Sequence, residues 1–445
     1  MRRYFTKDVL FDEQEAVGAI KQWAYPLRSK ANLQPLFDRI GDARVVMLGE
    51  ASHGTHEYYT WRTHITKRLI EEKGFNFIAV EGDWPDCYRL NRFVKGYDAE
   101  NKSAFKVLNA FNRWPTWMWA NWEIVALADW MLERNKGLPA NKKAGFYGLD
   151  VYSLWESMES IMQYLKKTDV TALKVAEDAY RCFEPYRKEE GQGYARASQF
   201  VPELCETEVV DLLKEIQHRL PTYNTDHENV FNAEQNAFVT VNAEKYYRAM
   251  IKGGPHSWNV RDRHMADTLE RLLKFHGENS KVIVWEHNTH VGDARATDMA
   301  DEGMYNIGEL ARMEHHKKGV VLVGFGSYKG SVMAGRSWGD VMRSMQMPEA
   351  RKGSLEYLLH TAGTQNKLLI TDDFAHNDVF MENHIGHRAI GVVYNPQYEQ
   401  YGNYVPTILP LRYDAFIYLD ETRALHPLHI QPDGTLMPET YPFGV

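Results

Sequence analysis

Long apolar runs and closely spaced cysteines are both missing from this 445-residue sequence. No run of about 18 consecutive apolar residues occurs, so the sequence predicts no membrane-spanning helix. The three cysteines, Cys87, Cys182 and Cys205, form no CxxC pair. This usage argues against a disulfide framework and favours a reducing, cytoplasmic location. The N-terminal segment has no apolar core of the kind found in signal peptides, so we expect none.

The motifs of several well-known sites are missing as well. The sequence has no GxSxG nucleophile elbow, no HExxH zinc helix, no phosphate-binding loop and no GxGxxG turn after a strand. His56-Glu57 begins like HExxH, but Thr60 stands where the second histidine would be. If the protein is an enzyme, these absences favour activated water over a side-chain nucleophile. A net charge of −8 argues against nucleic acid or an anionic membrane as the main partner.

Short apolar runs that alternate with helical patterns are what the sequence does contain. Nearly continuous apolar runs predict strands buried on both faces at 43–48, 75–80, 143–149, 281–285, 319–325, 389–394 and 415–419. After the first run, Tyr58, Trp61, Ile65 and Leu69 follow at helical spacing. Such an alternation predicts an α/β fold with a mostly parallel central sheet covered by helices.

The strand pattern stops in the middle of the chain, where long amphipathic stretches replace it. We therefore expect residues 1–154 to form the first half of the α/β core and residues 155–275 an inserted all-helical lobe over the active-site cleft. Residues 276–445 then form the second half of the core and a C-terminal tail. The pattern makes no prediction about the oligomeric state.

Acids and histidines follow four of the predicted strands. They are Glu50 and His53, then Glu81, then Asp150, and finally Glu286, His287 and His290. Ligands of open α/β sheets bind outside the carboxyl ends of the strands, where these side chains would converge. A lone polar residue at a strand end is usually a helix cap. Several charged side chains that converge at a buried edge, however, carry a desolvation cost, and such clusters typically have a function.

The chemistry of this cluster remains open between two kinds of site. A carboxylate beside an imidazole can orient the ring as a general base. When two carboxylates lie close together, the pKa of one is raised, so that one group can serve as an acid and the other as a base. The same histidines and acids can instead hold a divalent metal. His56 and His64, on the helix that follows, are expected to be ordinary packing or surface residues. The nearby tryptophans Trp84, Trp114, Trp117 and Trp119 line either an apolar pocket or the core.

Four blocks resemble one known family, in order and in context. They are "LGEASHGTHE", "AVEGDWPD", "GLDVYS" and "WEHNTHVGD", which together run from 48 to 293. The chain is similar here to the erythromycin esterase family, some members of which are designated succinoglycan biosynthesis proteins. The resemblance implies a metal-independent hydrolase without a cofactor, which opens a macrolide lactone with water and so confers antibiotic resistance. It also implies an α/β core with a helical lobe.

The resemblance places the family's functional residues on particular positions of this chain. It implies His53 as the essential histidine with Glu50 as its partner acid, and a helical arginine at Arg62. The remaining residues in catalytic roles are Glu81, His287 and His290. For substrate binding we expect Arg261, Trp84 and Asp150. His53 would act as general base on water, while Arg62 or a neutral histidine stabilises the oxyanion.

The leading interpretation is therefore a hydrolase of carboxylic esters or lactones that acts on a small molecule. Two alternatives use the same cluster of glutamates and histidines. One is a divalent-metal-dependent hydrolase or an iron- or haem-binding protein. The other is a binding or modifying protein related to exopolysaccharides.

Overall fold

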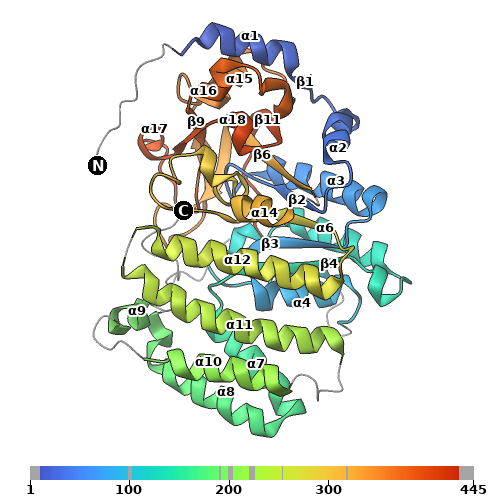
Figure 1. The fold of residues 1–445 in the computed structure, drawn as a ribbon, viewed down its shortest axis with the longest axis vertical. Coiled ribbons are helices and arrows are strands. Elements are labelled where there is room, and N and C mark those ends of the chain that lie inside the picture. Colours follow the sequence, from blue (N-terminus) through green and yellow to red (C-terminus); the bar gives the residue numbers. More distant parts are fainter. Residues whose placement is uncertain are drawn as a thin grey trace.

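A central sheet organises the computed structural model, which describes residues 11–98, 103–189, 192–198, 204–219, 226–252, 254–316 and 319–429. The nine-stranded sheet has the order β1-β8-β11-β6-β2-β5-β3-β4, with β7 paired to β6, and β9 pairs with β10 in a second small sheet (Figure 1). The strands are β1 (Tyr25–Pro26), β2 (Val45–Leu48), β3 (Phe77–Asp83), β4 (Gly145–Asp150), β5 (Val282–Trp285), β6 (Val320–Ala334), β7 (Arg343–Met347), β8 (Lys367–Ile370), β9 (Ile385–Arg388), β10 (Tyr404–Thr407) and β11 (Ala415–Thr422).

The six neighbouring strands from β11 to β4 all pair in parallel. The remaining strands pair antiparallel: β8 with the outer strand β11, β1 with β8, and β7 with β6. Every residue of β2 and β5 is buried, which agrees with their continuous apolar sequences. The predicted α/β fold with a mostly parallel central sheet is thus confirmed.

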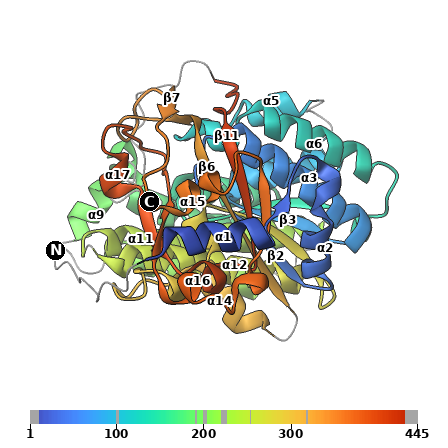
Figure 2. The same cartoon turned by 90° about the horizontal axis from the view of Figure 1, so that it is seen from above.

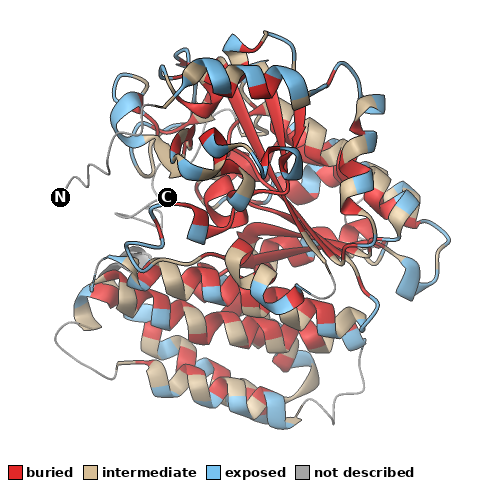
Figure 3. Ribbon diagram, turned by 45° about the horizontal axis from the view of Figure 1, so that its top comes forward, coloured by how far each residue is buried: buried red, intermediate tan, exposed pale blue. Residues whose placement is uncertain are grey.

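Helices cover both faces of the sheet (Figures 2 and 3). Val46 and Leu48 of β2 pack in the same core as α2, α3 and α6, whereas Val45 and Met47 pack in the core shared with α1, α12, α14 and α15. This alternation follows from the two-residue period of a strand. The bounds are α1 (Glu13–Trp23), α2 (Gln34–Ile40), α3 (His56–Lys73), α6 (Trp122–Asn135), α12 (Pro255–His276), α14 (Ile307–His315) and α15 (Leu355–Thr361).

The described residues of the connection from β4 to β5 contain helices and no strand. Its helices are α7 (Leu154–Thr168), α8 (Val170–Phe183), α9 (Gln192–Ser198), α10 (Glu206–Arg219), α11 (His227–Met250) and α12. In Figure 1, α8 and α10 lie farthest from the sheet and α11 lies between them and α12. Since Leu269 and Leu272 of α12 pack on the sheet, the last helix of this region belongs to the core as well. The boundaries of the predicted lobe stay a prediction.

Shorter helices complete the fold. They are α4 (Trp84–Val94), α5 (Ala104–Leu108), α13 (Asn288–Val291), α16 (Asp378–Glu382), α17 (Glu399–Gly402) and α18 (Leu409–Arg412). In the part of the chain that the structure describes, no helix has both the length and the apolar character needed to cross a bilayer.

The strand predicted at 389–394 does not form. Only isolated bridges occur in this segment, between Ile390 and Ser52 and between Val393 and Gly335. The Ile390 N–H donates to the carbonyl of Ala51 at 2.8 Å. This apolar run therefore packs along the loop that follows β2 instead of joining the sheet, because tertiary contacts override its strand propensity. The short strands β1, β7, β8, β9 and β10 were not predicted.

Two of the three cysteines are bonded to each other, which corrects the prediction of reduced cysteines. Cys182 of α8 and Cys205, just before α10, form a disulfide within the helical region. Cys87 is free and buried. Cysteine usage therefore gives no support to a cytoplasmic location, which stays a prediction.

Reduction of this disulfide is expected to destabilise the protein. Cross-linking two cysteines 23 residues apart removes chain entropy from the unfolded state, worth about 3 kcal/mol in the loop-closure model. A reductant should therefore lower the melting temperature of the wild type and leave that of Cys182→Ser unchanged. Thiol titration of unreduced, denatured protein should find one free thiol; three would contradict the pairing.

Candidate active site

The loop after β2 carries the first two residues of the site. Glu50 and His53 are buried, with 1% and 3% of their surface exposed. The Nδ1 atom of His53 lies 3.0 Å from Oε1 of Glu50. The loop is tightly packed: a Cβ atom on Gly54 would lie 1.9 Å from the backbone oxygen of Met333. Only glycine fits at this position, so the backbone that presents His53 is firmly held.

Arg62, on α3, fixes the other side of Glu50. Its Nη2 donates to Oε2 of Glu50 at 2.5 Å. The guanidinium carbon lies 4.4 Å from the ring centre of Tyr59 and 4.6 Å from that of Trp285. Because Arg62 is fully buried and its Nη2 is bound to Glu50, it acts on Glu50. This position does not support the predicted contact with an oxyanion.

Glu81, near the end of β3, joins the first loop to the loop after β5. Its Oε2 accepts a hydrogen bond from the backbone N–H of His287 at 2.9 Å, and its Oε1 accepts one from Nη2 of Arg261 at 2.6 Å. The same Oε1 lies 3.9 Å from Nε2 of His53. A water hydrogen-bonded to both of these atoms would bridge them.

Arg261 of α12 is the centre of a buried network. Its Nε and Nη2 donate to the two carboxylate oxygens of Asp150 at 3.0 and 2.7 Å. Its Nη1 lies 2.9 Å from Nε2 of His290, whose Nδ1 lies 2.9 Å from Asp262. Because a guanidinium only donates, Nε2 of His290 accepts this bond and its Nδ1 donates to Asp262. Both nitrogens of His290 are therefore engaged, and this residue holds Arg261 in place.

His287 is the neighbour of His53 within this cluster. The ring centres of the two residues are 4.9 Å apart. Nδ1 of His287 accepts the backbone N–H of Thr289, so a neutral ring carries its proton on Nε2. That atom makes no hydrogen bond of standard geometry within the described residues, although the backbone of Ala51 lies near it. His287 is thus an unengaged donor beside the candidate base.

Burial and neighbouring charges together set the pKa values of the site residues. Burial would lower the pKa of His53, but Glu81 and Glu50 outweigh it and raise the pKa above its usual value. The pKa of His287 falls well below its usual value, since burial and the nearby His53 both oppose its charge. Burial would raise the pKa of Glu81, but the neighbouring imidazoles and Arg261 hold it below its usual range.

An open pocket meets this cluster at the carboxyl ends of the parallel strands. It encloses about 810 Å³, its open mouth included. Its aromatic wall consists of Phe111, Trp114, Trp119, Tyr152 and Trp338, and its charged residues are His53, Glu81, Asp83, Asp86, Arg113, Asp150 and Arg261. Burial raises the pKa of Asp83 to about 7, although Arg113 lies 2.7 Å away. The size of the pocket and its combination of aromatic walls with charged groups suit a small organic ligand.

The structure places the predicted residues in three settings. His53, Glu81, Asp150 and Arg261 line the pocket; Glu50, Arg62, His287 and His290 stand behind them and are absent from the lining. Trp84 does not line the pocket, contrary to the prediction. Its ring is buried and stacks on Tyr88 and Tyr147. Trp114 and Trp119 do line the pocket, and Trp117 is in the core.

Sequence reasoning missed several partners of the site. Asp262 fixes His290, and the ring of Trp258 stacks on that imidazole at 4.5 Å. Asp262 and Trp258 lie on α12, one and three residues from Arg261. Their closeness to Arg261 in the sequence was the signal that could have identified them. Tyr152 and Trp338 also line the pocket; Tyr152 stands two residues after Asp150 in the block "GLDVYS", whereas Trp338 stands in none of the four blocks.

The carboxylates that would hold a metal here are already paired with cations. Glu50 binds Arg62, whereas Glu81 and Asp150 bind Arg261. A divalent ion would have to compete with these buried guanidinium groups for the same oxygens. Within the described residues, the cluster of three or more side chains with metal-ligand spacing is a different one, formed by His56, Glu123 and His426.

Comparisons with known proteins identify the family of this chain. The chain is 23% identical over 363 residues to erythromycin esterase type II of Escherichia coli, covering 76% of this chain and 83% of that protein. It is 23% identical over 424 residues to the putative hydrolase YbfO of Bacillus subtilis, covering 90% of both chains. A crystal structure of a succinoglycan biosynthesis protein has a similar fold, with a TM-score of 0.75 at 19% identity over 93% of this chain and 98% of that one. The family model for erythromycin esterase matches residues 70–422, and the chain therefore belongs to the erythromycin esterase family.

Proposed function

We propose that this protein hydrolyses a carboxylic ester or a lactone, with His53 as the general base that activates water. One observation carries the proposal. His53 is the histidine that lines the pocket, while its Nδ1 is held at 3.0 Å by the buried Glu50. When Nδ1–H donates to this carboxylate, the lone pair of Nε2 is directed away from Glu50 and is available to accept a proton.

In the proposed reaction, Nε2 of His53 removes a proton from a water that also binds Glu81. The water oxygen attacks the carbonyl carbon, and the carbonyl oxygen becomes an oxyanion. When the tetrahedral intermediate collapses, the C–O bond to the alcohol breaks and the alkoxide takes the proton from His53. The products are a carboxylic acid and an alcohol, joined in one molecule when the substrate is a lactone.

We assign the oxyanion to His287, which lies just behind the pocket lining and next to His53, the residue that activates the water. Its ring is neutral because its pKa lies well below the usual value, and its Nε2–H is the unengaged donor beside His53. A donor that is already in place stabilises the developing charge without reorganisation. Arg62 and His290 are positioning residues, because Nη2 of Arg62 binds Glu50 and the two ring nitrogens of His290 bind Arg261 and Asp262.

A hydrolysis screen tests this function. The substrates are model esters, macrolide lactones and acylated sugars, assayed in ¹⁸O-labelled water with and without a chelator. We expect one class to be cleaved with one ¹⁸O atom entering the carboxylate, in the presence of chelator as well. Failure on every ester would favour a binding protein. Activity that a chelator abolishes and added metal restores would favour the metal-dependent alternative.

The rate is expected to fall on the acidic side with an apparent pKa above 6.5. Glu81 and Glu50 outweigh burial and raise the pKa of His53, and a protonated imidazole cannot accept a proton from water. Therefore kcat/KM should rise as the pH increases through the pKa of His53. A rate profile from pH 5 to 9 measures this limb.

Asp83 needs a separate control, because it lines the pocket and its pKa is about 7. The acidic limb should persist in Asp83→Asn, whose amide does not titrate. If the limb vanishes in that variant, Asp83 and not His53 is the group that controls the rate.

A further inference from the structure

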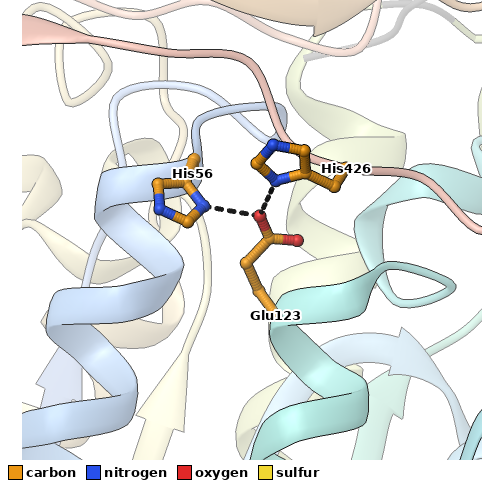
Figure 4. Close-up of side chains that lie close together, drawn as sticks. All are labelled: His56, Glu123 and His426. Carbon is orange, nitrogen blue, oxygen red and sulfur yellow. Dashed lines mark hydrogen bonds and ion pairs between the residues drawn. The ribbon is translucent and has the colours of Figure 1, made fainter.

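Three side chains from distant parts of the chain meet beside the loop that carries His53. His56 is the first residue of α3, Glu123 is the second residue of α6, and His426 lies in the segment after β11. Figure 4 shows both imidazoles directed at the carboxylate of Glu123. The Nδ1 atoms of His56 and His426 lie 2.6 and 2.7 Å from Oε1 of Glu123. The active-site pocket includes none of the three.

The spacing of the donor atoms suits a small divalent cation. One nitrogen from each histidine and one carboxylate oxygen lie within 4.8 Å of one another. Zinc bonds to nitrogen and oxygen are about 2.0–2.2 Å long in tetrahedral sites, so an ion between these atoms requires the two N–O distances to open by less than about 1 Å. The side chain of His426 is 62% exposed, which leaves room for both this movement and a water ligand.

Glu123 supplies a second, independent observation. Its side chain is only 3% exposed, yet its Oε2 is buried and makes no hydrogen bond of standard geometry among the described residues, although the backbone of Glu123 itself lies near the carboxylate. A buried carboxylate oxygen without a partner is costly in a folded protein. The carboxylate therefore has unused capacity to bind a cation, on the same side chain that both histidines approach.

Other charges near the cluster weigh slightly against a cation. The N-termini of α3 and α6 both lie at the cluster, and each helix dipole would weaken binding roughly two- to five-fold. Arg423 is close as well, but its guanidinium pairs with Glu57 at 3.1 Å. Three ligands acting together on one ion outweigh these effects, because transition-metal ions bind imidazole and carboxylate strongly.

We propose that His56, Glu123 and His426 bind one Zn²⁺ ion, with water at the fourth position. Two histidines and one glutamate are a known ligand set for zinc with an open position. The site is distinct from the proposed hydrolytic centre, and the ion takes no part in the reaction steps assigned to His53.

The ion would fasten the C-terminal segment to the loop that carries His53. The backbone of this segment already binds both neighbours: His56 donates to the carbonyl of Arg423 at 2.8 Å, and Leu425 donates to that of Gly54 at 2.9 Å. On the other side, Trp122 of α6 donates to the carbonyl of His426 at 3.0 Å. Zinc would add a direct link between these three segments, so bound zinc should stabilise the fold.

Calorimetric titration of the full, chelator-treated protein with Zn²⁺ tests the site. We expect one equivalent to bind and the melting temperature to rise. His426→Ala and Glu123→Gln should each weaken binding by more than the roughly 10–100-fold that loss of an outer-shell partner costs. Binding should also tighten as the pH rises, because protons compete for the imidazole nitrogens. Bound Co²⁺ should show the visible absorption of a four-coordinate ion.

Two control variants make the result decisive. His376→Ala removes an exposed histidine outside the cluster and should bind zinc like the wild type. His53→Asn should also keep its one equivalent, because His53 is not a ligand of this site. The proposal is overturned if no saturable binding occurs, or if His426→Ala binds zinc as tightly as the wild type. Zinc binding that disappears in His53→Asn alone would place the ion in the active site and overturn it too.

Discussion

His53→Asn is expected to lower kcat by about 10²–10⁴-fold, the contribution of a well-positioned general base. The asparagine side chain can still hydrogen-bond, but it cannot accept a proton from water at neutral pH. The buried pair with Glu50 makes the geometry dependent on this one ring. The measurement is single-turnover hydrolysis of a substrate found in the screen, together with circular dichroism to confirm the fold.

His64→Asn is the matched control for that experiment. His64 lies on α3, and its pKa is lowered by partial burial and by the nearby Lys30, Arg68 and Lys67. It lies outside the pocket lining, so its replacement should leave the rate unchanged. If His53→Asn instead retains the wild-type rate while folded, His53 is not the base and the proposed mechanism fails.

Arg261→Met is expected to destabilise the protein by about 3–5 kcal/mol, the usual cost of removing one partner of a buried ion pair. The guanidinium binds Glu81 and Asp150 and donates to His290. Methionine fills much of the same volume but leaves two buried carboxylates without their cation. Chemical denaturation followed by fluorescence gives the change in the free energy of unfolding. Hydrolysis should also be lost, because Glu81 and His290 lose a shared anchor.

Arg263→Met is the control for Arg261, because it removes an exposed arginine two residues away on α12. Surface substitutions of this kind change stability by less than about 0.5 kcal/mol. A second comparison isolates the cause: adding Asp150→Asn to Arg261→Met should recover part of the loss, since one of the uncompensated charges is removed. If Arg261→Met lowers the free energy of unfolding no more than Arg263→Met does, the buried network contributes little to stability.

Strand prediction succeeded where burial on both faces imposed a continuous apolar sequence. The runs that became β2, β3, β4, β5, β6 and β11 lie in the parallel block of the sheet, where helices cover both faces. The run at 389–394 has a similar composition, but its Ile390 pairs with the loop after β2. A short apolar run thus shows that a segment is buried, and the partner available in space decides whether it becomes a strand.

The roles of the site residues were harder to predict from the sequence than their positions. Arg62 and His290 lie close to the site, as the motifs predict, but each is engaged in holding another side chain. Trp84 was predicted to face the substrate, yet its indole N–H donates to Asn232 of α11 in the core. The direction in which a side chain points depends on the neighbours that satisfy its polar atoms, and those neighbours are distant in sequence.

The sequence by itself determined the α/β class and the edge of the sheet at which the chemistry gathers. Parallel strands present their carboxyl ends together, so residues at or just after the ends of β2, β3, β4 and β5 meet there. Tertiary structure alone decided which of them face the pocket, that Cys182 bonds to Cys205, and that His426 reaches His56 and Glu123. These pairings arise between segments up to hundreds of residues apart, where packing of the complete core, and not local pattern, sets the distances.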